Sequence, residues 1–120
     1  MQKALFAAGA FAGLTAVALA SLAAHGLASL PPSGLALVHT ATQILAWHAF
    51  ALLGAALWLP RGGRITQAAG LCFAAGTAIF CTTVVTLGLG ISAIAWPAPI
   101  GGTLLLAGWA LLLVAAFRAG

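Results

Sequence analysis

Acidic residues are absent from this sequence: its 120 residues include no aspartate and no glutamate, and only 3% are charged. A soluble surface needs roughly a quarter charged residues, so the chain is not a soluble globular domain. Without carboxylates it also lacks a Ser-His-Asp triad, a carboxylate pair and an acidic metal site. The cysteines lack CxxC spacing, and the glycines form no phosphate loop. We therefore expect no enzyme and no metal site.

Basic residues are also few, and they do not cluster. The formal net charge of +4 comes from Lys3, Arg61, Arg64 and Arg118, with no acidic residue to balance them. Nucleic-acid binding needs lysines and arginines gathered on one face, so nucleic acid is excluded as a partner. These charges instead mark the loops of a protein whose surroundings are a lipid bilayer.

Long hydrophobic runs make up most of the chain, in which 64% of the residues are hydrophobic. Breaks at proline, glycine and charged residues leave four stretches, about 4–24, 34–59, 65–89 and 99–117. Each reaches the ~20 residues that a helix needs to cross a hydrocarbon core. Strict apolar–polar alternation is absent, so a barrel is excluded. The sequence predicts an all-α membrane protein, a single domain (1–120) forming a four-helix transmembrane bundle.

The orientation of this bundle follows from the basic residues. Lys3 precedes the first stretch, Arg61 and Arg64 separate the second from the third, and Arg118 follows the fourth. The other two loops carry no lysine or arginine. Because loops rich in lysine and arginine stay on the cytoplasmic side, we expect both termini in the cytoplasm.

The first stretch has an alternative interpretation as a secretory signal peptide. Lys3 precedes it, and Ala18-Leu19-Ala20 resembles a cleavage site. The apolar core of a signal peptide has about 7–15 residues, and this stretch is longer. We therefore expect it to be retained as a membrane helix.

Small residues are placed for close helix packing. Gly9 and Gly13 form a small-xxx-small pair that continues through Ala16 and Ala20 on one stripe. Helices in lipid associate through such close approaches, because lipid offers no hydrophobic incentive. The stripe indicates packing within the bundle, with homodimerisation as the alternative.

Polar side chains concentrate toward the outer half of the predicted bundle. Four of them are candidates for one polar site: His25, His39, Gln43 and Thr83. Polar side chains commonly bond across membrane helices for modest gain, so a hydrogen-bond network is the simpler interpretation. A small pocket for a ligand or lipid headgroup is the alternative.

His48 lies near the middle of the second stretch, close to the bilayer midplane. It shares a helix face with Ala41, Ala51 and Ala55, whereas Gln43 points about 140° away. Burial disfavours the charged imidazolium, and the chain has no carboxylate to stabilise it. We expect a neutral imidazole bonded to a backbone carbonyl or a hydroxyl. Contact with haem, a quinone or a partner subunit in an oligomer is the alternative.

Five short motifs, in order along nearly the whole chain, resemble a known family. They are Ala24-His25-Gly26-Leu27, Thr40-Ala41-x-Gln43, His48-Ala49, Pro99-Ile100-Gly101-Gly102 and Gly108-Trp109. The pattern is similar to domain of unknown function 423, the YgdD-like small bacterial inner-membrane proteins, which have eukaryotic transmembrane relatives. The resemblance implies four helices, a bacterial inner-membrane location and an uncharacterised function, and it marks Gly26, Pro99, Gly101 and Gly102 as structural positions. The chain departs from the family at Ile44-Leu45 and in the segment 81–85.

Three functional hypotheses remain at this point. The first is a non-catalytic accessory or packing subunit of a larger membrane assembly, which associates with other subunits or with itself. The second is a binding or conducting protein that uses a polar pocket in the outer half of the bundle. The third is a haem or quinone contact through His48 in an oligomer.

Overall fold

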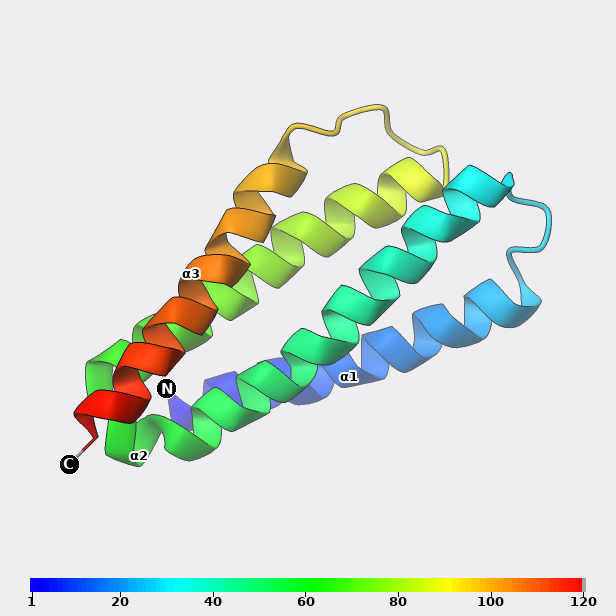
Figure 1. Cartoon of the computed structure of the whole chain (residues 1–120). Helices are drawn as coiled ribbons and strands as arrows, with labels where there is room; N and C mark the ends of the chain where they lie inside the picture. Colours follow the sequence, from blue (N-terminus) through cyan, green and yellow to red (C-terminus); the bar gives the residue numbers. More distant parts are fainter. Residues whose placement is uncertain (120) are drawn as a thin grey trace.

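The computed structural model describes residues 1–119, and within them it contains three α-helices and no strand (Figure 1). Helix α1 spans Gln2–His25, α2 spans Pro32–Gly88 and α3 spans Pro97–Arg118. All three are long and apolar enough to cross a membrane. The expectation of four separate helices is wrong, because the predicted stretches 34–59 and 65–89 both belong to α2, which has 57 residues.

Helix α2 reverses its direction at one residue, Gly63. Gly63 is the residue inside α2 whose backbone angles (φ 57°, ψ −142°) are not helical. These angles lie close to a region of the Ramachandran plot that is essentially restricted to glycine. The sequence predicts a loop around Arg61 and Arg64, but in the structure a single glycine turns the chain, and the residues on both sides of it are helical. We call residues 32–62 the first arm and residues 64–88 the second arm. The arms run side by side (Figure 1).

The start of α1 compensates for a proline near this reversal. Pro60 lies inside α2 and has no backbone N–H to donate to the carbonyl four residues earlier, that of Ala56. The side chain of Gln2 donates from Nε2 to this same carbonyl at 2.9 Å. The hydrogen bond ties the first turn of α1 to the end of the first arm.

Helices α1 and α3 each pack against α2 and, within residues 1–119, not against each other. Gly9 of α1 lies so close to the first arm that a Cβ there would be 3.0 Å from the Ala49 carbonyl oxygen. Gly101 of α3 and Gly76 of the second arm approach as closely, since a Cβ on Gly76 would be 2.8 Å from the Gly101 oxygen. Small residues therefore do permit close packing within the chain.

The structural positions marked by the sequence lie at helix ends and at this contact. Gly26 caps α1, and its N–H donates to the Leu22 carbonyl at 2.7 Å. Helix α3 begins at Pro97 rather than at Pro99, so Pro99 is its third residue. The first N–H groups of a helix have no carbonyl partner within the helix, so the missing N–H of Pro99 costs no hydrogen bond. Gly101 is buried against α2, whereas Gly102 is only half-buried.

Candidate functional site

His48 is buried at the centre of the molecule, on the face of the first arm shared with Ala41, Ala51 and Ala55. Its Nδ1 lies 2.6 Å from the carbonyl oxygen of Ile44, one turn earlier. The indole Nε1 of Trp109 donates to His48 Nε2 at 3.1 Å. An indole N–H can only donate, so Nε2 is the acceptor and Nδ1 carries the proton that bonds Ile44. This pattern describes a neutral imidazole with a backbone carbonyl partner.

Three rings from three parts of the chain meet at this point. The ring centroids of His48 and Trp109 are 6.0 Å apart, and Phe73 of the second arm lies 5.7 Å from His48 and 5.1 Å from Trp109. Tilted and edge-on pairs at these distances are favourable aromatic geometries. Phe73 is fully buried, while Trp109 is 46% exposed. The cluster therefore connects both arms of α2 with α3.

Trp109 was not predicted from the sequence as the partner of His48. Its position along the chain was the one available signal. Indoles are common at the ends of membrane helices, whereas Trp109 lies well inside the last apolar stretch. A donor-only side chain at the depth of a buried imidazole is a natural partner for it. Pairing the two still required knowing which helices are neighbours.

The haem alternative for His48 does not fit this geometry. An axial ligand needs the free lone pair of one ring nitrogen. In the structure Nδ1 is occupied by its proton and the Ile44 carbonyl, and Nε2 accepts the indole N–H of Trp109. His48 thus has a structural environment in which both nitrogens are already used.

The other four candidates for a polar site do not surround His48, and only His39 and Gln43, one turn apart on the first arm, share a helix face. His25, His39 and Gln43 are exposed, and their side chains make no hydrogen bond to any of residues 1–119. Thr83 is buried, but its hydroxyl donates to the carbonyl of Ile79 in its own helix at 2.7 Å. No network joins these side chains within the part of the chain that the structure describes.

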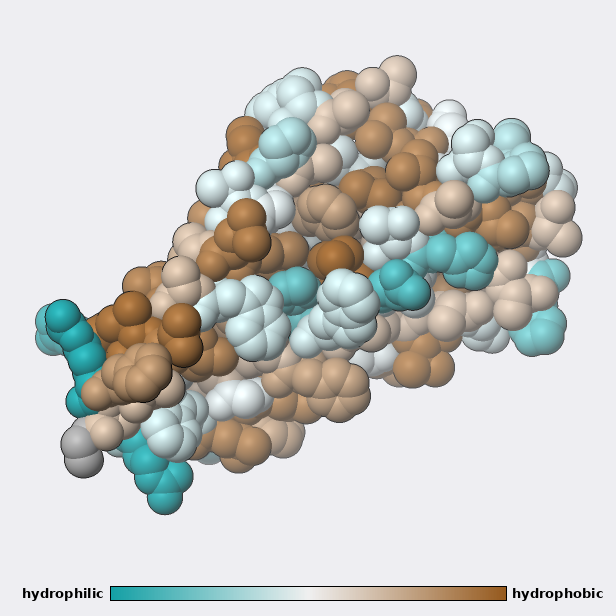
Figure 2. Space-filling view, viewed as in Figure 1, coloured by the Kyte–Doolittle hydropathy of each residue, from teal (hydrophilic) through white to brown (hydrophobic). Residues whose placement is uncertain are grey.

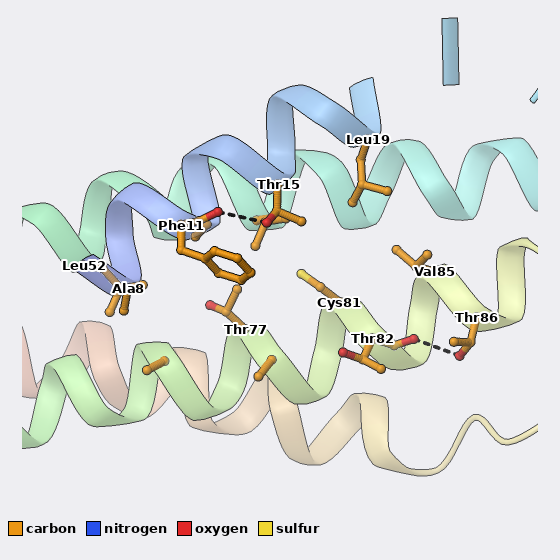
Figure 3. Close-up of a pocket in the computed structure, with 14 residues that line it drawn as sticks. Ala8, Phe11, Thr15, Leu19, Leu52, Thr77, Cys81, Thr82, Val85 and Thr86 are labelled. Carbon is orange, nitrogen blue, oxygen red and sulfur yellow. Dashed lines mark hydrogen bonds between the residues drawn. The ribbon is translucent and has the colours of Figure 1, made fainter. Parts of the chain in front are cut away.

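A different set of residues forms a cavity of about 460 Å³ between α1 and the second arm, with the first arm behind it (Figure 3). Its walls are mainly alanine, leucine, phenylalanine and valine, with threonines and Cys81 among them. None of the five candidates from the sequence lines it. The sequence did not predict this cavity, because its lining is mostly apolar and comes from three segments.

A family model described as protein of unknown function (DUF423) matches residues 19–102, well over half of the chain. The chain belongs to the DUF423 family. The matched span includes His48 and Phe73, whereas Trp109 and most of α1 lie outside it. Neither the curated proteins nor the solved structures contain a match to the chain.

We expect that His48→Leu will destabilise this DUF423 protein by about 1–2 kcal/mol, the net value of a hydrogen bond plus lost ring contacts. The indole N–H of Trp109 would lose its acceptor. In protein labelled with ¹⁵N-tryptophan, one of the 4 indole signals should therefore shift strongly, while that of the distant Trp96 should not.

A double-mutant cycle provides the control for this prediction. Trp109→Phe should cost a similar free energy of unfolding, and the double variant should cost less than the sum of the two. Strictly additive costs would show that the His48–Trp109 contact contributes no coupling energy.

Proposed function

We propose that this chain is a multi-pass protein of the bacterial inner membrane and acts as a non-catalytic accessory subunit that docks through one face of α2. Both termini lie on the cytoplasmic side in this proposal. Its support is the placement of charge: the termini and the reversal of α2 lie at one end of the molecule (Figure 1). All four basic residues belong to that end, as the positive-inside rule requires.

The observation that carries the docking role is the exposed amide of Gln43. It lies about 16 Å along the helix from Pro32, at a rise of about 1.5 Å per residue, so in a bilayer it lies within the hydrocarbon core, in its outer half. Lipid chains offer no hydrogen-bond partner at that depth. Polar side chains in membrane helices accordingly face protein or water. Here the amide faces outward and has no partner within residues 1–119.

Gln43 belongs to a stripe of exposed side chains that we call the polar face: His39, Thr40, Gln43 and Trp47. Figure 2 shows hydrophilic residues in a line over the first arm, across an otherwise largely apolar surface. Trp47 is 59% exposed, and its indole N–H also has no partner within residues 1–119. Several outward donors and acceptors at membrane depth are typical of a helix–helix interface.

A suitable partner presents hydrogen-bonding side chains at the same depth. A second copy meets this requirement, because a two-fold axis normal to the membrane places each residue opposite its own counterpart. An amide contains both a donor and an acceptor, so two Gln43 side chains are complementary to each other. Another membrane subunit with a polar side chain at this depth would serve equally.

The test is extraction from native membranes in mild detergent, followed by native mass spectrometry. Wild type should appear bound to a second copy or another subunit. Gln43→Leu, which removes the amide at similar volume, should weaken that complex by roughly threefold to tenfold, the value of one interhelical hydrogen bond in a membrane.

Thr103→Val is the matched control, because this exposed hydroxyl already donates to the Pro99 carbonyl at 2.7 Å. It should leave the complex unchanged. A wild-type protein found only as a monomer, or a Gln43→Leu complex as strong as wild type, would contradict the proposal.

A further inference from the structure

The cavity between α1 and the second arm arises where α1 diverges from that arm. Near the start of α1, Leu5 packs directly on Gly70 of the second arm, where a Cβ would lie 2.6 Å from a leucine methyl. Farther along, α1 remains close to the first arm at Gly9, but Ala8 and Ala12 face the cavity that Ala74 and Ala78 line from the opposite side. These methyl groups are too short to close the space. The volume of about 460 Å³ lies within the range of roughly 300–1,000 Å³ that small-molecule sites occupy.

One polar atom in this cavity lacks a partner. Thr77 lines the cavity and is 4% exposed, and its Oγ1 has no hydrogen-bond partner within residues 1–119. Figure 3 draws this side chain between α1 and the second arm, facing the space that Phe11 and Cys81 also border.

Most threonine hydroxyls of the chain donate a hydrogen bond to a backbone carbonyl of their own helix. The hydroxyls of Thr15 and Thr86 also line the cavity, and they donate to carbonyls four residues earlier in their own helices, at 2.9 Å and 2.8 Å. Thr83, two turns after Thr77 on the same arm, does the same at 2.7 Å.

Thr77 does not use the carbonyl of Phe73 in this way. A buried hydroxyl without a partner is costly. Thr66 Oγ1 is also buried without a partner within residues 1–119, but Thr77 is the one of the two that lines the cavity, so a molecule in the cavity can supply its missing partner.

The other residues that line the cavity limit the kinds of molecule that can carry this hydrogen-bonding group. No charged side chain lines the cavity, and apart from the threonines and Cys81 its walls are apolar. A charged ligand would be buried there without a counter-charge, which is strongly unfavourable. From Thr77 to Thr86 the cavity follows the second arm for about 13 Å at a helical rise of about 1.5 Å per residue. The shape therefore suits an extended apolar chain.

We propose that this cavity binds an uncharged, extended, largely apolar molecule that carries one hydrogen-bonding oxygen. The oxygen of this molecule forms a hydrogen bond with Thr77 Oγ1. Its apolar chain lies between α1 and the second arm and extends toward Val85. A lipid ester and an isoprenoid quinone both have this chemistry. The site is separate from the polar face of the first arm and does not depend on the accessory role proposed above.

The experiment uses the full chain in phosphatidylcholine vesicles and a photoactivatable dodecanol that carries a diazirine. Labelled residues are mapped by mass spectrometry, with 1-dodecanol and dodecane as competitors. Labelling should concentrate on the residues that line the cavity, and 1-dodecanol should compete several-fold better than dodecane. Thr77→Val, which removes only the hydroxyl, should reduce labelling by roughly fivefold, the effect of one net hydrogen bond. Thr77→Ser should retain it.

Thr103→Val serves as the control, because its hydroxyl is outside the cavity. Competition by methyl laurate, whose oxygens belong only to an ester, would assign the oxygen to a lipid ester, and competition by decylubiquinone would assign it to a quinone carbonyl. Competition by neither, or labelling spread equally over all lipid-facing helix surfaces and unchanged in Thr77→Val, would overturn the proposal. The cavity would then hold only bulk lipid chains.

Discussion

Replacing Phe73 with alanine is expected to lower the free energy of unfolding by about 3 kcal/mol, at the lower end of the usual range for this substitution. Phe73 is fully buried and contacts the rings of both His48 and Trp109. For a membrane helix we expect the lower end of that range, because the side chain remains in lipid when the helices separate. The lost free energy then comes from packing contacts and from the cavity left behind, and not from transfer of the ring to water. Unfolding by SDS in mixed micelles measures the change.

Phe50→Ala is the matched control for this prediction. Phe50 is 75% exposed on the first arm and does not line the cavity between α1 and the second arm, so removing its ring leaves no enclosed cavity in the helix core. Its cost should stay within about 0.5 kcal/mol, as for substitutions at exposed positions. Equal costs for the two variants would show that the three-ring cluster does not stabilise the fold.

Gly101→Leu is expected to separate α3 from α2 and to cost about 3 kcal/mol or more, beyond the usual range for an overpacked site. A Cβ at Gly101 would lie 2.6 Å from the backbone nitrogen of Phe80 and 2.9 Å from the carbonyl oxygen of Gly76. These neighbours are backbone atoms of a continuous helix, so they cannot move aside as a flexible side chain does. The same SDS titration measures the loss.

Gly102→Leu changes the next residue in the same way and provides the control. A Cβ there would meet only Phe80 Cδ2, at an ordinary contact distance of 4.0 Å. Glycine is itself unfavourable inside a helix by roughly 0.5–1 kcal/mol relative to alanine, so this variant should be neutral or slightly stabilising. If both leucine variants behave alike, the close backbone contact between α2 and α3 is not important for stability.

Much of the helical architecture follows from local sequence. The apolar runs are long enough for membrane helices, and proline and glycine mark their ends, so the predicted starts at residues 34 and 99 lie two residues after the observed starts at Pro32 and Pro97. The number of helices was wrong because Gly62 and Gly63 look like a loop in sequence. Whether glycines form a loop of several residues or reverse the chain at a single residue depends on backbone angles, and within α2 Gly63 alone departs from helical values.

Some features of the candidate site could likewise be predicted from the sequence, and others could not. Helix periodicity alone places His48 on an inward face and Gln43 on a different one. The partners of these side chains depend on which helices are neighbours. The same holds for Thr77, which looks no different in sequence from the threonines that bond their own helix.

The sequence by itself determined that the chain forms helices apolar and long enough to cross a membrane, that it has no carboxylate side chains, and how far apart the polar side chains lie along each helix. These properties depend on composition and on the fixed rise and turn of a helix. Only the tertiary structure decided that Trp109 bonds His48, that Gly101 lies against Gly76 and that α1 leaves a cavity along the second arm. The physical reason is that lipid exerts no preference among apolar helix faces, so contacts follow from the shapes of several segments together.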